Sequence, residues 1–121
     1  MIKILLVGAG GFVGAVLRYL AGLIPLKADS GFPIKTFAIN VLGAFVIGII
    51  TALVSKGDNV NPNVVLMLQV GLCGGFTTFS TFAYESFDLM KNGSMLVAVL
   101  YMVLSVVFSV LAVFFAHILV K

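Results

Sequence analysis

Charged and cross-linking residues are scarce in this sequence, and each shortage excludes a class of protein. Lysine and arginine together number 7 and aspartate and glutamate 4, so charged residues make up 9% of the 121 residues. A soluble domain carries about a quarter charged residues, and no water-exposed surface can be built from so few. The single cysteine, Cys73, excludes an intrachain disulfide framework. With one histidine, His117, it supplies too few ligands for a zinc-type site.

Groups for catalysis are missing as well. The sequence has no nucleophile paired with a base, no metal-ligand cluster and no phosphate-binding loop, so we predict that the chain is not an enzyme. No basic run occurs, and the net charge of +3 is explained by lysines that flank membrane spans, which argues against a nucleic-acid partner. His117 lies near the end of the last apolar run and is interpreted as an interfacial residue without a role of its own.

Long apolar runs are what the sequence contains instead. Hydrophobic residues make up 62% of the chain, and the mean hydropathy is +1.27. No charged residue occurs within 36–55, 59–84 or 92–120, and only Arg18 interrupts the run 4–26. About 20 apolar residues cross the hydrocarbon core of a bilayer. We therefore predict an all-α membrane protein embedded in the lipid bilayer, a single four-helix domain over 1–121 with spans at about 4–26, 36–55, 63–90 and 95–120.

The first 20 residues, MIKILLVGAGGFVGAVLRYL, also resemble the start of a dinucleotide-binding unit. Val13 stands where the pattern G-x-G-x-x-G requires its last glycine, and the following residues lack the polar outer face of a Rossmann helix. On a membrane helix the small residues serve a different purpose, because they let a second helix approach closely. The residues that share this face are Gly11, Gly14, Ala15 and Arg18.

The lysines give almost no preferred orientation in the membrane. They fall into two equal groups at the two membrane faces, Lys3, Lys56 and Lys121 at one and Lys27, Lys35 and Lys91 at the other. A chain that inserts both ways up shows such a balance. Four helices also enclose little by themselves, so we predict an antiparallel, dual-topology homodimer. A single, weakly biased topology is the alternative.

Polar residues within the spans are candidates for function, because each costs free energy in hydrocarbon. Asn40 shares a helix face with Ala44 and Gly48, and its amide can donate either to an anion or to a neighbouring helix. In the last span three hydroxyl groups recur at every fourth position and predict a polar track, although a single serine commonly bonds its own backbone. They belong to Tyr101, Ser105 and Ser109.

The run GLCGGFTTFSTF, from Gly71 to Phe82, is a poor helix former in the middle of the third span. We predict a break there. A break frees backbone carbonyl and amide groups at membrane depth, which is tolerated where they bind something, typically an ion. The phenylalanine rings add positive edges that can face an anion without a formal charge.

These motifs resemble the Fluc (CrcB) family of small bacterial fluoride channels. The resemblance rests on GGFVGAVLRY in the first span, Asn40 in the second and GLCGGFTTFSTF in the third, and it covers essentially the whole chain. It implies four membrane helices with a broken third helix, and an antiparallel homodimer with two pathways. Through these, fluoride leaves the cytoplasm passively across the bacterial plasma (inner) membrane.

The resemblance also implies roles for individual residues. Asn40, Phe79 and Phe82 would contact fluoride, and Ser80 and Thr81 would line the polar side of the pathway. The hydroxyl stripe from Tyr101 through Ser105 to Ser109 would continue it. The backbone carbonyls of Gly74 and Thr77 would hold a structural sodium ion on the two-fold axis.

A small multidrug-type, proton-coupled cation exporter is the alternative function. It needs a carboxylate inside the membrane, whereas Asp29 and Asp58 fall in connections and Glu85 and Asp88 lie toward the end of the third span. Arg18 has three interpretations: it draws anions into a vestibule, it extends to the membrane surface, or it pairs structurally with Glu85.

Overall fold

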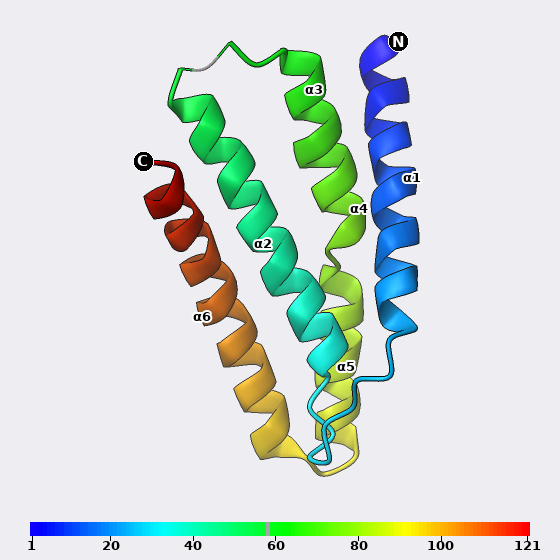
Figure 1. Ribbon diagram of the computed structural model, residues 1–121. Helices are drawn as coiled ribbons and strands as arrows, with labels where there is room; N and C mark the ends of the chain where they lie inside the picture. Colours follow the sequence, from blue (N-terminus) through cyan, green and yellow to red (C-terminus); the bar gives the residue numbers. More distant parts are fainter. Residues whose placement is uncertain (58) are drawn as a thin grey trace.

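A computed structural model describes residues 1–57 and 59–121, and every regular element in them is helical. The elements are α1 (Ile2–Gly22), α2 (Ile34–Ser55), α3 (Pro62–Leu66), the π-helix η1 (Met67–Cys73), α4 (Gly74–Phe76), α5 (Phe79–Lys91) and α6 (Met95–Val120). The elements α3, η1, α4 and α5 follow one another along one rod, and α1, α2 and α6 are rods of their own. All of them lie roughly along one direction (Figure 1). Asp58, which the sequence analysis placed in a connection, lies outside the described residues.

Four helical stretches are long and apolar enough to cross a membrane, which confirms the predicted number of spans. They are Ile2–Gly22, Ile34–Ser55, Pro62–Lys91 and Met95–Val120. The first begins and ends earlier than the expected 4–26. Pro25 accounts for the early end, because proline has no N–H and its ring clashes with the carbonyl four residues before it.

Local signals set both ends of the third span. Pro62 occupies the first helical position, and the side chain of Asn61 accepts a hydrogen bond from the Asn63 amide. At the other end Gly93 has a φ of +82°, a conformation that glycine adopts without strain. The Ser94 amide donates to the Leu89 carbonyl at 2.8 Å and closes the helix terminus.

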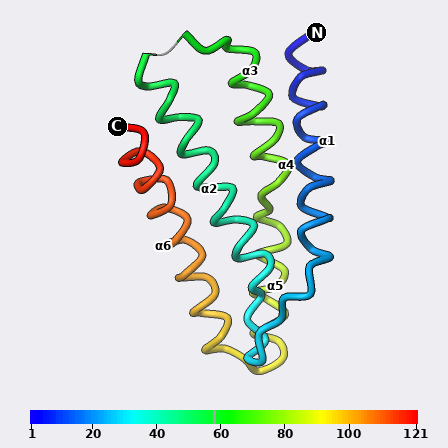
Figure 2. Tube along the Cα trace, in the orientation of Figure 1, coloured from blue at the N-terminus to red at the C-terminus, as the bar shows by residue number. Residues whose placement is uncertain are grey.

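The third span is interrupted near its middle, as predicted. Thr77 and Thr78 have extended backbone between α4 and α5, with ψ angles of 159° and 120°. Figure 2 shows the trace bending at this point. The side chain of Thr78 then begins α5 by accepting a hydrogen bond from the Thr81 amide. A π-helical stretch precedes the break and shifts the register of the side chains before it.

Glycines bring α1 and the upper half of the third span into backbone contact. A Cβ atom on Gly14 would lie 2.3 Å from the Leu72 carbonyl oxygen, and one on Gly75 would lie 2.6 Å from the Gly11 carbonyl oxygen. Gly14 and Gly11 thus form the expected small-residue face. The structure adds Gly10, whose Cβ would lie 2.4 Å from the Met67 carbonyl oxygen.

We expect Gly14→Ala to destabilise the protein by about 1 to 3 kcal/mol, because the new methyl group meets fixed backbone atoms and must push two helices apart. Thermal unfolding of the purified protein in detergent measures the effect. Gly8→Ala is the matched control in the same helix, since no atom of residues 1–57 or 59–121 is found within 4 Å of its Cβ position. Equal unfolding temperatures for the two variants would contradict the close approach.

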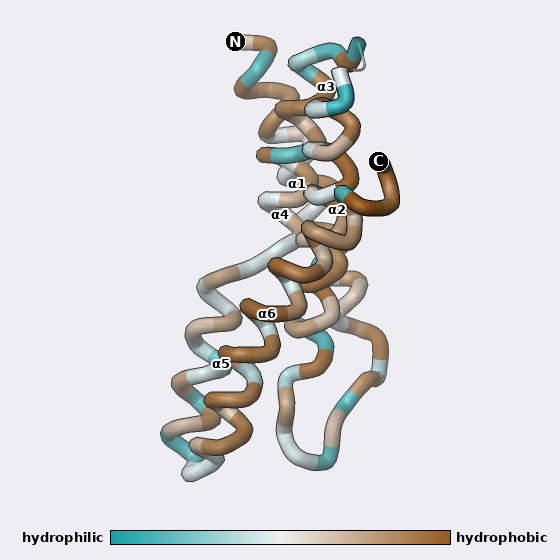
Figure 3. The backbone as a smooth tube through the Cα atoms, turned by 90° about the vertical axis from the view of Figure 1, so that its left-hand side faces the viewer, coloured by the Kyte–Doolittle hydropathy of each residue, from teal (hydrophilic) through white to brown (hydrophobic). Residues whose placement is uncertain are grey.

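The α2 and α6 helices pack side by side along their length (Figure 1). Gly48 permits this approach, because its Cβ would lie 2.8 Å from the Cβ of Ala116. The opposite side of α6 carries exposed valine, leucine and phenylalanine side chains. Figure 3 shows α6 as a nearly continuous apolar strip, as expected for a surface in contact with lipid tails.

Candidate functional site

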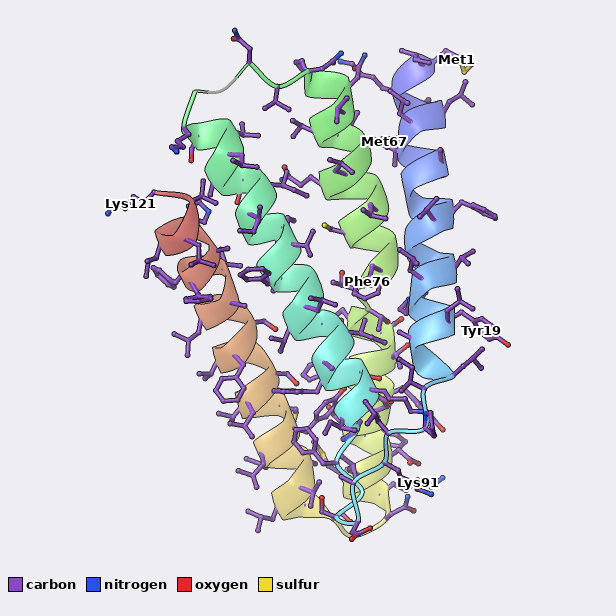
Figure 4. The ribbon with its side chains drawn as sticks, viewed as in Figure 1. Met1, Tyr19, Met67, Phe76, Lys91 and Lys121 are labelled. Carbon is purple, nitrogen blue, oxygen red and sulfur yellow. The ribbon has the colours of Figure 1, made fainter. Side chains whose placement is uncertain are left out.

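The break in the third span opens onto a cavity of about 340 Å³ between α2, α5 and α6. The label of Phe76, the last residue of α4, marks the position just before the break in Figure 4. Five of the residues predicted for the fluoride pathway meet at this cavity, although they come from three helices. The cavity is lined by Asn40, Thr77, Thr78, Phe79, Phe82, Ser105, Val106, Ser109 and Val110.

Asn40 holds the break in shape through two hydrogen bonds to one residue. Its Nδ2 donates to the Thr78 carbonyl at 3.1 Å, and its Oδ1 accepts from the Thr78 amide at 2.8 Å. The pair replaces hydrogen bonds that Thr78 would make in a continuous helix. A carboxamide carries two N–H groups, so one donor of Asn40 is left for the cavity that the side chain lines.

Aromatic rings form one wall of the cavity. The centroids of Phe79 and Phe82 lie 5.6 Å apart, and the Phe82 ring packs on Tyr101 at 5.1 Å. Phe79 is 80% exposed in the isolated chain, whereas Tyr101 is completely buried. The Phe82 ring is therefore supported from behind by a buried ring, whereas the Phe79 ring lies open on the surface of the chain.

Only two of the three residues of the predicted hydroxyl track line the cavity. Tyr101 does not line the cavity, because its hydroxyl donates to Oε1 of Glu85 at 2.9 Å. Ser105 and Ser109 do line it. The Ser105 hydroxyl is buried without a hydrogen-bond partner among the described residues, so it does not bond its own backbone as a lone serine commonly would.

Ser80 and Thr81 lie outside the cavity lining. Ser80 is exposed on α5, and the Thr81 amide donates to the Thr78 hydroxyl at 3.2 Å. Their expected place along the polar side of the pathway stays a prediction.

Glu85 is a residue whose importance the sequence analysis missed. Its Oε2 accepts from the Thr36 hydroxyl at 3.0 Å, and Tyr101 occupies Oε1, so one carboxylate joins α2, α5 and α6. A glutamate within an apolar span was the available signal, because such a charge needs partners. Glu85 also lines a second cavity of about 570 Å³ beneath the loop that links α1 to α2.

Arg18 contacts the break and not Glu85. Its Nε donates to the Gly75 carbonyl at 3.2 Å, while both carboxylate oxygens of Glu85 accept from hydroxyl groups. Of the three expected roles, the geometry favours a structural one, but toward a freed carbonyl group instead of a carboxylate.

The two carbonyls expected to hold sodium are left without their helical partners. In a continuous helix the amides of Thr78 and Thr81 would donate to the carbonyls of Gly74 and Thr77. Here those amides donate to Asn40 Oδ1 and to the Thr78 hydroxyl. Neutral backbone oxygen atoms are ligands that a hard cation accepts, so the chemistry of these two residues fits the expected ion.

Comparison with known proteins shows which family the chain belongs to. The model of the family described as CrcB-like protein, Camphor Resistance (CrcB), matches residues 5–117. The fluoride-specific ion channel FluC of Chlorobaculum tepidum is 50% identical over 101 residues, which cover 84% of this chain and 80% of that protein. The FluC of Ruminiclostridium cellulolyticum is 43% identical over 122 residues, which cover 100% of this chain and 94% of that protein.

A third similar protein is the FluC of Chlorobium phaeobacteroides strain BS1, which is 43% identical over 118 residues and 98% of this chain. The family match spans all four helices, the break and every residue that lines the cavity. This chain therefore belongs to the CrcB family, whose similar members are named fluoride-specific ion channels.

Proposed function

We propose that this chain is a fluoride-specific ion channel of a bacterial plasma (inner) membrane, through which fluoride leaves the cytoplasm passively. The observation that carries the proposal is the cavity at the break, which is lined by neutral donors and aromatic rings and by no charged side chain among the described residues. The names of the similar family members supply the identity of the anion.

The cavity can replace part of an anion's hydration shell. The second N–H of Asn40 and the hydroxyls of Ser105 and Ser109 can donate hydrogen bonds, and the edges of Phe79 and Phe82 add a weak positive potential. A buried lysine would hold the anion strongly. Neutral groups bind weakly enough for the ion to leave, which conduction requires.

A proton-coupled cation exporter is a poorer fit. It needs a carboxylate that exchanges protons and substrate, and both oxygens of Glu85 are occupied by Thr36 and Tyr101. Purified protein in liposomes loaded with fluoride or chloride, read with ion-selective electrodes, tests the proposal. We expect fast fluoride efflux and little chloride efflux. Efflux of neither anion, with proton-driven cation uptake, would refute the channel.

The site is completed by a second, inverted copy of the chain. The cavity lies open on the surface, and Phe79 at its edge is 80% exposed in the isolated chain. A partner chain would cover this face and enclose the ion. Three lysines lie at each membrane face, so the chain can insert in both orientations. Two copies in opposite orientations then form an antiparallel dimer with two pathways.

Orientation-locked variants test this dimer. Three lysines added beside Lys121 should fix one orientation, and three added in the loop near Lys27 should fix the other, because positive residues stay in the cytoplasm. Either variant alone should carry almost no fluoride, and co-expression should restore flux. Full activity of one locked variant by itself would exclude the antiparallel dimer.

A structural sodium ion would lie where the breaks of the two copies meet. The carbonyls of Gly74 and Thr77 would hold it, supported by the two displaced amides of Thr78 and Thr81. Hard cations prefer such oxygen ligands. In this arrangement the ion joins the two chains without taking part in fluoride transfer.

Replacing sodium by N-methylglucamine should weaken the dimer, because this organic cation is too large to enter the shared site. The fraction of dimer, measured by crosslinking in detergent, should fall and should recover when sodium is returned. Potassium replacement serves as a control for ionic strength. A dimer fraction that is identical without sodium would remove the structural role.

A further inference from the structure

A separate cavity of about 410 Å³ lies between the C-terminal ends of α2 and α6, remote from the break. Lys56 and Lys121 stand at its rim together with His117, and Phe114 and Ile118 form part of its wall. Lys56 and Lys121 directly follow the last residues of the two spans. The cavity is therefore at the level where lipid headgroups meet the hydrocarbon region.

The lysine side chains at this end have few acidic partners. The helix C-termini beside them carry only partial negative charges, which favour a nearby lysine. The opposite end of the molecule differs. Its three lysines, Lys27, Lys35 and Lys91, are matched by three acidic residues, whereas the end with Lys56 has three lysines against one acidic residue in the sequence.

His117 is held at the rim by a hydrogen bond to α2. Its Nε2 lies 3.0 Å from the Thr51 hydroxyl oxygen, which also lies 2.9 Å from the Ile47 carbonyl and 3.1 Å from the Gly48 carbonyl. Which of the two groups donates depends on the imidazole tautomer. The imidazole thus has a fixed position, with Nδ1 as its remaining polar atom.

The wall below the rim is apolar. Phe114 is 64% and Ile118 66% exposed, and both lie toward the membrane side of the lysines. A cationic rim above an apolar wall matches a molecule with an anionic head and hydrocarbon tails. A free inorganic anion would use the rim alone.

We propose that this cavity binds the phosphate group of an anionic phospholipid, with Lys56 and Lys121 at the phosphate and the start of an acyl chain against Phe114 and Ile118. Basic pockets between membrane helices bind such headgroups. In an antiparallel dimer each leaflet would hold one site. The inference requires only that the four helices span a bilayer, so it does not rest on the fluoride pathway.

The test compares two double variants of the purified full chain. Native mass spectrometry in detergent measures the phosphatidylglycerol and phosphatidylcholine that each variant retains. A lysine near the membrane surface contributes about fivefold to anionic lipid affinity, so K56Q/K121Q should retain phosphatidylglycerol about 25-fold more weakly. The matched control K27Q/K91Q should retain it like the unaltered protein. Both variants shift the lysine balance by two, in opposite directions, so an effect through membrane orientation would appear in both.

Three results would overturn the proposal: equal retention of the two lipids, an equal loss in both double variants, or release of phosphatidylglycerol by millimolar inorganic phosphate. The last would show a free-phosphate site. Fluoride flux is measured separately, after the same purified proteins have been reconstituted into liposomes. Loss of lipid retention in K56Q/K121Q with normal flux supports the lipid site. Absence of flux in the unaltered protein would refute the channel and would leave the proposed lipid site unaffected.

Discussion

Asn40→Asp is expected to stop fluoride flux almost completely. The carboxylate would place a negative charge on the cavity wall, and it would face the Thr78 carbonyl where Nδ2 now donates at 3.1 Å. Two like charges about 4 Å apart repel by about 4 kcal/mol at the effective dielectric of a partly solvated site. That corresponds to a roughly thousandfold fall in rate. Fluoride efflux from liposomes at neutral pH measures it.

Asn63→Asp is the matched control for this experiment. It makes the same charge change in the first turn of α3, where a carboxylate is favourable, and it lies outside the cavity lining. Its flux should equal that of the unaltered protein. If Asn40→Asp conducted fluoride at the same rate and eluted like the unaltered protein in size-exclusion chromatography, Asn40 would not contact the ion path.

Phe79→Ile and Phe82→Ile should each slow fluoride flux by roughly 30-fold. Isoleucine keeps most of the bulk but removes the ring quadrupole with its positive edge. A ring face contributes about 2 kcal/mol to a desolvated cation, and we take the same magnitude for an anion at the ring edge. Phe79 gives the cleaner result, because it is 80% exposed in the single chain and its replacement disturbs little packing within it. Phe82 also packs on Tyr101 at 5.1 Å, so its variant requires a check of thermal stability.

Phe12→Ile provides the comparison for both rings. Phe12 is 71% exposed on α1 and is absent from the cavity lining, so the same exchange should leave flux unchanged. Normal flux in both cavity variants would show that the rings only fill space. A similar slowing in all three variants would point to a general effect of isoleucine on the protein in the bilayer.

The double variant Phe79→Ile with Phe82→Ile shows whether the rings act together. Their centroids lie 5.6 Å apart, and contacting residues are seldom additive. If one ion meets both ring edges at once, the combined loss should be smaller than the product of the single losses. If the two rings meet the ion at separate points along the path, the combined loss of flux should equal the product of the two single losses.

The sequence by itself determined the four spans and the position of the break. Uncharged runs of about 20 residues can satisfy their backbone groups in lipid only as helices, so length and composition were sufficient. Gly74, Gly75 and the threonines after them predicted the interruption for a similar local reason, since these residues support a helix poorly. Periodicity also placed Gly11 and Gly14 on one face of the first span.

Only the tertiary structure decided which polar groups are free. Spacing put Tyr101, Ser105 and Ser109 on one stripe, yet the Tyr101 hydroxyl donates to Glu85. The Ser105 hydroxyl beside the cavity has no hydrogen-bond partner in the described part of the chain. The sequence likewise could not pair Asn40 with Thr78 or Arg18 with Gly75. Helical periodicity fixes the direction of a side chain relative to its own axis. The partner it meets depends on how the helices are rotated and spaced, and that is set by backbone contacts such as Gly14 against Leu72 and Gly48 against Ala116.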